Sequence, residues 1–356
     1  MMKSRDCDVA RPMAVVAPDD FKGTFSAREV AAAVARGLRS AGVDADELPI
    51  ADGGDGTLDA LLASAGGEMH AARVSDPLGR AVEARWAMLP DGETAIVEMA
   101  EASGLRRVAP DERDAWGAST RGTGELIAAA AAAGAKHVLV AVGGSATTDG
   151  GAGAVQELRR ARVEIPITVV CDVKVRFEDC AQVFGPQKGA DPDMVERLAQ
   201  RLQELADSAP KDPRGREMTG AAGGLSGGLW AFCDAELVDG ARFVLDAVAF
   251  DERLSAATIA VSGEGRLDKQ TLTGKAVAEV ARRCRVACKP LHVVAGQNAL
   301  GPDEARELGL AGVQVATTRD ELEAAGRTLA IELLGGSVAA TTTGSQSATR
   351  SCRPSG

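Results

Sequence analysis

The fold is decided by the stretch His137–Gly153, which reads HVLVAVGGSATTDGGAG. Its opening residues are apolar and rich in valine, which predicts a buried strand over His137–Val142. A glycine-rich turn follows at Gly143–Gly153 and leads into a short helix. A strand that passes through glycines into a helix is typical of an α/β fold with a parallel sheet.

The same alternation continues along the chain in both directions. Apolar runs predict strands at Met13–Ala17, Glu47–Ala51, Ile167–Val173, Thr258–Ser262, Leu291–Ala295 and Gly312–Ala316. Helical periods predict helices at Ser26–Ser40, Thr57–Ala65, Gly122–Ala133, Met194–Ala206, Gly274–Arg283, Pro302–Leu308 and Arg319–Leu334. This spacing predicts a mainly parallel, doubly wound sheet of the Rossmann or flavodoxin type.

Between Arg73 and Met99 the pattern changes to three short β-type runs separated by turn residues, which predicts an antiparallel meander. We therefore expect two α/β lobes. The first is a Rossmann-like lobe formed by both chain ends, residues 13–72 and 255–334, and the second is an inserted lobe with a mixed sheet, residues 73–254. Residues 335–356 are mostly Gly, Ser, Thr and Ala, which predicts a disordered tail.

The composition excludes several classes of protein. The chain has 356 residues and a net charge of −11, which disfavours binding to nucleic acid or to an anionic membrane surface. Its N-terminal segment is charged, and its most apolar run is too short to span a membrane. The seven cysteines are scattered, which favours reduced thiols. We expect a cytoplasmic protein that acts on a small molecule, and a homodimer stays open.

Glycines cluster directly after predicted strands, at Ala51–Gly56, Gly143–Gly153 and Ser262–Asp268, and at the start of the helix that follows Thr120. In open α/β sheets ligands bind at the carboxyl ends of the strands. Glycine lets backbone N–H groups approach an anion there, and a helix N-terminus adds partial positive charge. These loops together indicate a phosphorylated or phosphate-donating ligand. The alternative is that each glycine only makes a tight turn.

Aspartates follow the same predicted strand ends, among them Asp149, Asp172 and Asp268. Such carboxylates can hold Mg²⁺, or accept the proton of a reacting hydroxyl. The alternative is that they cap helices and turns. Lys22 and Lys188 stand beside glycines and can neutralise a transferring phosphoryl group. There is no P-loop motif, and the single G-x-G after Ser262 is weak evidence for a dinucleotide enzyme.

A series of motifs resembles those of the bacterial type I glycerate kinase family, in the same order. They are APDDFKGT at Ala17–Thr24, ADGGDGT at Ala51–Thr57, TRGTGE at Thr120–Glu125, GGSATTDGGAG at Gly143–Gly153, FGPQKG at Phe184–Gly189, GAAGG at Gly220–Gly224 and GEGRLD at Gly263–Asp268. The resemblance implies an ATP-dependent kinase that phosphorylates D-glycerate, at the 2-hydroxyl. It also implies two α/β lobes with the active site between them.

From the strand-end pattern and this resemblance we expect a definite set of site residues. The catalytic carboxylates are Asp149, Asp172 and Asp268, of which Asp172 and Asp268 hold Mg²⁺. The substrate- and phosphate-binding residues are Lys22, Asp52, Gly53, Gly54, Arg121, Gly143, Gly144, Ser145, Lys188, Gly263, Gly265 and Arg266.

Two segments depart from the family pattern. Gln156–Pro166 is a short bridge where the family has a longer stretch that contains glycine, and Lys174–Asp179 replaces an Asn-Pro-Leu loop. These departures keep a second interpretation open, that of a non-catalytic protein derived from such a kinase that binds nucleotide or glycerate. A Rossmann-type oxidoreductase is a third.

Overall fold

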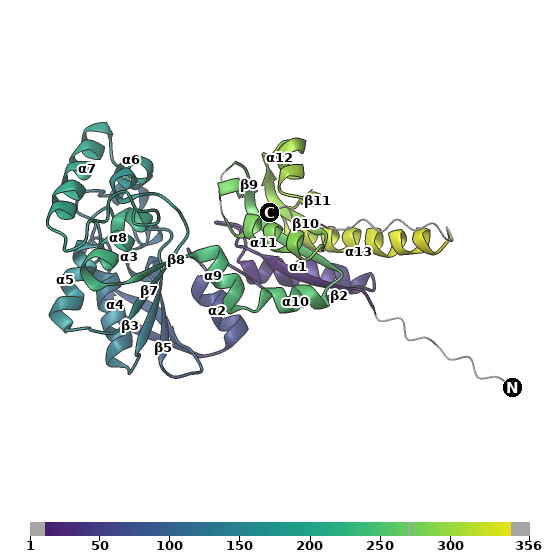
Figure 1. The fold of residues 1–356 in the computed structure, drawn as a ribbon, viewed down its shortest axis with the longest axis horizontal. Helices are drawn as coiled ribbons and strands as arrows, with labels where there is room; N and C mark the ends of the chain where they lie inside the picture. Colours follow the sequence, from purple (N-terminus) through teal and green to yellow (C-terminus); the bar gives the residue numbers. More distant parts are fainter. Residues whose placement is uncertain (1–10, 270, 274, 343–356) are drawn as a thin grey trace. The chain divides into compact units, whose positions relative to one another are not determined.

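The computed structural model describes residues 11–342 except 270 and 274 (Figure 1). They form two compact units. The first comprises the described residues up to Pro49, Ala249–Thr273 and the residues from Val277 onward; the second comprises Ile50–Val248 and a short piece ending at Ala276. Residues 50–72 thus group with the second unit, whereas the sequence analysis expects them in the first lobe. In the described ranges no helix has the length and apolar character of a membrane span.

The first unit contains a parallel five-stranded sheet in the order β11-β10-β9-β1-β2. Its strands are β1 (Met13–Pro18), β2 (Asp44–Glu47), β9 (Ile259–Leu267), β10 (Leu291–Asn298) and β11 (Leu310–Val315). The chain winds outward from β1 to β2 on one side and from β9 to β10 and β11 on the other. The winding direction therefore reverses between β1 and β9, where open α/β sheets bind ligands.

The second unit contains a mixed six-stranded sheet in the order β3-β4-β5-β6-β7-β8. Its strands are β3 (Glu68–Ser75), β4 (Ala81–Met88), β5 (Thr94–Glu98), β6 (His137–Ala141), β7 (Ile167–Cys171) and β8 (Glu236–Asp239). The first three form the expected antiparallel meander, and β5 to β8 run parallel. The predicted fold class, with one parallel and one mixed sheet, is confirmed.

Helices connect these strands. The first unit has α1 (Ala27–Ser40), α10 (Phe250–Ala256), α11 (Ala276–Val286), α12 (Pro302–Glu307), α13 (Arg319–Thr342) and the 3-10 turn η5 (Thr271–Thr273). The second has α2 (Thr57–Ala65), α3 (Ala100–Ser103), α4 (Arg121–Ala132), α5 (Ala152–Ala161), α6 (Cys180–Phe184), α7 (Pro192–Asp207), α8 (Ala221–Cys233), α9 (Gly240–Ala247) and the turns η1 (Leu105–Arg107), η2 (Pro110–Glu112), η3 (Phe177–Asp179) and η4 (Pro186–Lys188).

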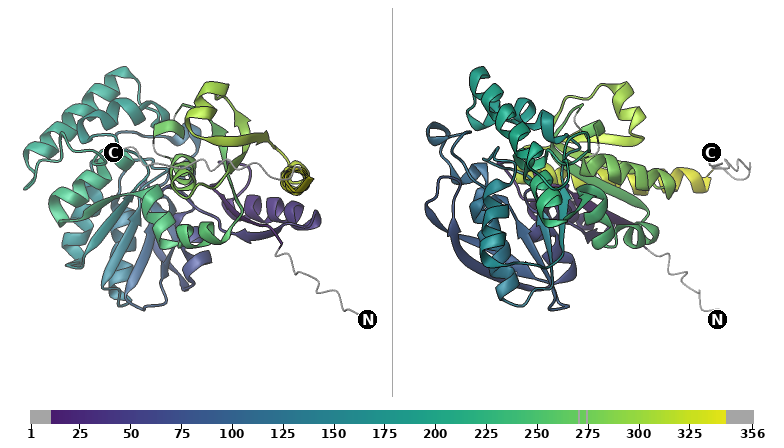
Figure 2. Two further views of the ribbon diagram at one scale, coloured as in Figure 1. Left: turned by 45° about the vertical axis from the view of Figure 1, so that its right-hand side comes forward. Right: turned by 60° about the vertical axis from the view of Figure 1, so that its left-hand side comes forward.

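Helices α1 and α13 come from opposite ends of the chain and lie side by side (Figures 1 and 2). A capping box of Ser26 and Glu29 starts α1. Glycines allow the close approach, since a Cβ at Gly37 would lie 2.0 Å from the Glu323 carbonyl oxygen and one at Gly326 would lie 2.2 Å from that of Val34. The two helices share a buried core with β1, β9 and β10.

Some elements differ from the sequence prediction. The sequence predicts a strand at Glu47–Ala51, but β2 spans Asp44–Glu47. The prediction followed the apolar residues Leu48 and Ile50, which are buried although they lie outside any strand. The glycine-rich segment at Gly220–Gly228 is largely helical, with left-handed residues near its start. Helix α13 continues to Thr342, into the segment for which the composition predicts disorder. The rest of that segment, 343–356, lies outside the described residues.

Candidate active site

The parallel strands of the second unit end at one edge of the sheet, where several polar residues gather. Glu98 is the last residue of β5, Gly143 and Gly144 follow β6, Asp172 follows β7, and Asp239 ends β8. Because these ends are adjacent in the sheet order, the loops after them form one surface. The predicted residues Gly143, Gly144 and Asp172 therefore lie together.

The turn Asp52–Asp55 packs onto this edge. A Cβ at Gly143 would lie 2.3 Å from the Cα of Gly54 and 3.2 Å from Oδ2 of Asp172. The carbonyl of Gly53, a residue with φ +100°, accepts a hydrogen bond from the N–H of Val142. Two backbones can meet this closely only because both residues are glycines. The predicted residues Asp52, Gly53 and Gly54 thus join the same cluster.

Asp55 lies against the glycine loop. A Cβ at Gly144, which has φ +63°, would lie 2.7 Å from Oδ2 and 2.8 Å from Oδ1 of Asp55. Oδ1 is buried and has no hydrogen-bond partner among the described residues. A buried carboxylate oxygen without a partner is costly and calls for an explanation. Asp55 follows the strand that the sequence predicts at Glu47–Ala51, yet it is absent from the predicted set.

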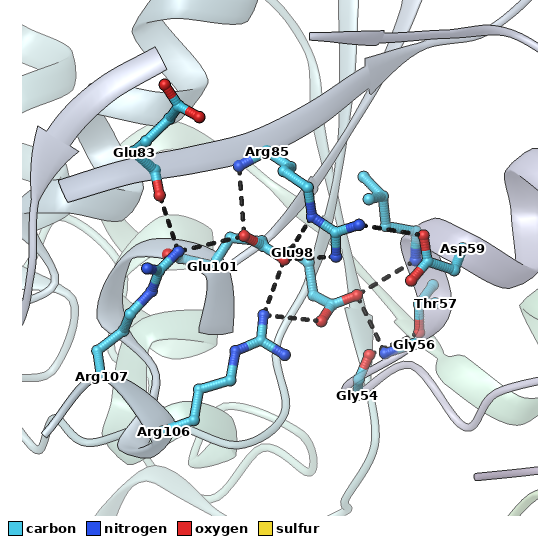
Figure 3. A network of polar contacts seen from close by, with 11 residues as sticks. Gly54, Gly56, Thr57, Asp59, Glu83, Arg85, Glu98, Glu101, Arg106 and Arg107 are labelled. Atoms are coloured by element: carbon cyan, nitrogen blue, oxygen red, sulfur yellow. Dashed lines mark hydrogen bonds and ion pairs between the residues drawn. The ribbon is translucent and has the colours of Figure 1, made fainter. Parts of the chain in front are cut away.

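Glu98 was missed by the sequence analysis, although it closes an apolar strand as the aspartates do. Its side chain is buried, and its Oε2 accepts the N–H groups of Gly56 at 3.1 Å and Leu58 at 3.3 Å (Figure 3). Burial, and then the nearby charge of Asp55, raise the pKa of Glu98 to about 7. A carboxyl group that titrates near neutral pH is typical of functional sites.

Lys188 forms hydrogen bonds to the glycine loop after β6. Its ammonium is buried and donates to Oγ of Ser145 at 2.8 Å and to the carbonyl of Thr147. Burial lowers the pKa of Lys188 to about 8. The predicted residues Ser145 and Lys188 are thus brought together, with Lys188 tied to the loop. Beside them lies a pocket of about 50 Å³, lined by Val142, Gly143, Gly144, Ser145, Asp172, Val173, Phe184, Gln187 and Ala222.

The hydrogen bonds of Asp149 and the ion pair of Arg121 lie at the starts of α4 and α5, outside this cluster. The Asp149 carboxylate accepts hydrogen bonds from the N–H and hydroxyl of Thr120 and from the N–H groups of Gly151 and Gly153. Arg121 is exposed and pairs with Glu125 at 2.9 Å. Asp149 therefore joins the start of α4 to the start of α5, a geometry that favours the capping alternative.

The other predicted residues lie in the first unit, where the winding direction reverses. Strand β1 ends at Pro18, opposite Gly263, whereas β9 continues to Leu267, past the strand end expected at Ser262. A Cβ at Gly265 would lie 3.2 Å from the backbone nitrogen of Lys22, so the loop after β1 contacts the last part of β9. Arg266 pairs with Asp268 over 3.2 Å. The structure therefore brings Lys22, Gly263, Gly265, Arg266 and Asp268 into a second cluster.

A larger cavity of about 620 Å³ contains none of these residues. It lies near the amino end of β7, at the short bridge of the sequence analysis. Its walls are Leu158, Arg159, Arg162, Val163, Glu164, Ile165, Pro166, Ile167, Phe232, Cys233 and Asp234. We assign the site to the carboxyl ends of the strands, because that edge carries the carboxylates and the glycine loops.

Comparisons with known proteins show the family of the chain. The model of the glycerate kinase family matches residues 14–161 and 156–334, two segments that meet at the short bridge. Glycerate kinase of Bacillus subtilis is 39% identical over 79% of this chain and 84% of the relative, and glycerate 2-kinase of Escherichia coli is 37% identical over the same shares. A crystal structure assigned as glycerate kinase 2 from Salmonella typhimurium LT2 superposes with a TM-score of 0.78 at 34% identity, covering 92% of this chain and all of the other. The chain therefore belongs to the glycerate kinase family and is a kinase.

Proposed function

We propose that the protein transfers the γ-phosphoryl group of ATP to the 2-hydroxyl of D-glycerate, giving 2-phosphoglycerate. The observation that carries the proposal is the contact of Gly54 with Gly143 beside Asp172. This contact places glycine backbone next to a carboxylate at the strand ends. The backbone N–H groups can bind a phosphate, and the carboxylate can accept the proton of a hydroxyl. The position of the acceptor hydroxyl rests on the relative from Escherichia coli, which is named a glycerate 2-kinase.

Phosphoryl transfer needs mainly positioning and charge neutralisation. In this proposal the glycine loops at Gly53–Gly54 and Gly143–Gly144 hold phosphate oxygens through backbone N–H groups. Lys22 supplies positive charge to the substrate carboxylate or the phosphate. The glycerate oxygen forms a bond to the γ-phosphorus, the bond to the β–γ bridging oxygen breaks, and the hydroxyl proton passes to the Asp172 carboxylate.

The residues present fit Mg²⁺, which would neutralise charge on the phosphates. Mg²⁺ usually takes one or two carboxylates and keeps water and phosphate oxygens as its other ligands. No group of three or more metal-binding side chains occurs within the described residues, so a site of that open kind is the one to consider. Of the two predicted ligands, Asp172 lies beside the glycine loop, with its Oδ2 3.2 Å from the Cβ position of Gly143, and Asp268 pairs with Arg266.

An assay of ADP release with D-glycerate, ATP and Mg²⁺, followed by ³¹P NMR of the product, tests the proposal. We expect turnover and a phosphorus signal coupled to the C2 proton. A phosphorus signal coupled to the C3 protons would reject the 2-hydroxyl. No turnover with retained ATP binding would favour the non-catalytic alternative that the short bridge keeps open. A cytoplasmic location belongs to the same proposal.

A further inference from the structure

The turn that carries Asp55 lacks a local cap. Gly56 is the N-cap residue of α2, has φ +87°, and has no side chain that could accept the first N–H groups of the helix. Unsatisfied N–H groups at a helix start need an acceptor. Glu98, 42 positions away from Gly56, supplies it by accepting from Gly56 and Leu58. The distant end of β5 therefore fixes the start of α2.

The Glu98 carboxylate also lies close to Arg106, which is next to a residue that binds the glycine loop after β6. Oε1 of Glu98 lies 3.7 Å from the guanidinium of Arg106, which also pairs with Glu101 at 2.9 Å (Figure 3). The residue before Arg106 is Leu105, whose N–H donates to the carbonyl of Gly144 at 2.8 Å. Glu98 and Arg106 thus connect the turn at Gly54–Leu58 with the glycine loop after β6.

We propose that Glu98 is a positioning residue of the phosphotransfer site, which holds the Asp55-bearing turn against Gly143–Gly144 through its hydrogen bonds to Gly56 and Leu58 and its ion pair with Arg106. The inference rests on the proposed function for its kinetic consequences. The contacts of Glu98 do not depend on that function, because they are all formed within the protein.

The ionised form of Glu98 is the one that holds the turn, since a carboxylate accepts N–H groups more strongly than a carboxylic acid does. The charged groups that face it are Asp55 from the turn, Arg106 from η1 and Arg85 from β4. The negative charge of Asp55 opposes ionisation and Arg106 favours it. The pKa of about 7 places this transition near neutral pH.

The test compares Glu98→Gln with wild type and with Asp59→Asn. Gln keeps the size of the side chain and one acceptor oxygen, so the fold survives. Asp59 is an acidic residue of α2 that is 62% exposed and lies 3.6 Å from Arg85. We expect kcat of wild type to rise through about pH 7. In Glu98→Gln that step disappears and kcat falls by ~10-fold or more, the size that misplacement of reacting groups produces. Asp59→Asn should keep the step near pH 7 and the wild-type kcat.

A Glu98→Gln protein with the wild-type pH profile and kcat would overturn the inference. If wild type does not phosphorylate glycerate, the proposed function fails, and amide hydrogen exchange of residues 54–58 then decides the role of Glu98. Faster exchange there in Glu98→Gln than in Asp59→Asn supports the positioning role. Equal exchange in the two variants overturns it.

Discussion

The ammonium of Lys188 and the hydroxyl of Ser145 form a buried hydrogen bond of 2.8 Å that ties the segment Pro186–Lys188 to the glycine loop after β6. The same ammonium also donates to Thr147 within that loop. Lys188 is thus more than a surface charge beside a glycine. Its positive charge lies beneath the backbone that faces the proposed phosphate, where burial makes the ionised form expensive.

Lys188 gives a prediction about stability at alkaline pH. The folded pKa is about 8, below the usual 10.5, so between these values the unfolded chain binds a proton that the folded chain lacks. The free energy of unfolding should therefore rise with pH across this window, by about 3 kcal/mol at most. Urea unfolding should show this rise in wild type and its loss in Lys188→Met. Lys136→Met, whose side chain is 70% exposed, should keep it.

Glu98 gives the opposite dependence at mildly acidic pH. Its folded pKa of about 7 lies above the usual 4.5, so the folded chain binds more protons in this window. The free energy of unfolding should fall as pH rises through it, by about 3 kcal/mol at most. Glu98→Gln should lack this fall. Urea unfolding at several pH values measures it, and parallel curves for variant and wild type would contradict it.

Gly143→Ala should damage the site without any change of charge. The added methyl group would lie 2.3 Å from the Cα of Gly54, so the two loops must separate. We expect a loss of stability of about 1–3 kcal/mol, as for other overpacked sites, and kcat reduced by ~10²-fold. Gly134→Ala is the matched control for activity, because nothing lies within 4 Å of its Cβ position; its φ of +107° leaves only local strain. Equal kcat in the two variants would argue against close loop contact.

Asparagine substitutions distinguish the role of Asp172 from the role of Asp149. If Asp172 accepts the hydroxyl proton or holds Mg²⁺, Asp172→Asn keeps its stability and loses ~10²–10⁴-fold in kcat. Asp149 accepts four hydrogen bonds at the starts of α4 and α5. We expect Asp149→Asn to lose stability while its remaining folded fraction keeps most of the activity. Thermal unfolding and kcat per folded molecule measure both, and the reverse pattern would return Asp149 to the catalytic set.

Substitution of Lys22 tests whether the cluster in the first unit takes part in binding or catalysis. It is exposed and follows Phe21 in the loop against Gly265. Lys22→Ala should raise KM for glycerate or ATP, or lower kcat, by at least ~10²-fold, the effect of a lost charged contact at a transition state. Lys22→Arg should recover part of the loss. Steady-state kinetics measure this, and wild-type constants in Lys22→Ala would remove it from the site.

The sequence predicted the ends of β6 and β7 to within two residues, because the glycines and the aspartate that follow them are local signals. The grouping of Gly143 and Asp172 follows from parallel strands that end at one edge. Asp52 and Gly54 join them through the packing of a turn that follows no strand of that sheet, and the roles of all four residues stay predictions. Glu98 could not be found this way, because its function as a cap depends on a partner 42 positions away. The position of β2 was missed for another reason: hydrophobicity reports burial, whereas an edge strand such as Asp44–Glu47 is defined by pairing.

The discontinuity of the first unit has a consequence for synthesis on the ribosome. Residues up to Pro49 emerge early, but their strand β1 pairs with β9, which is made about 200 residues later. At ~5–20 residues per second this is a delay on the order of 10 s. The second unit is nearly continuous and can finish folding during that time. The nascent β1–α1–β2 segment meanwhile exposes apolar surface, which makes it a natural client for chaperones.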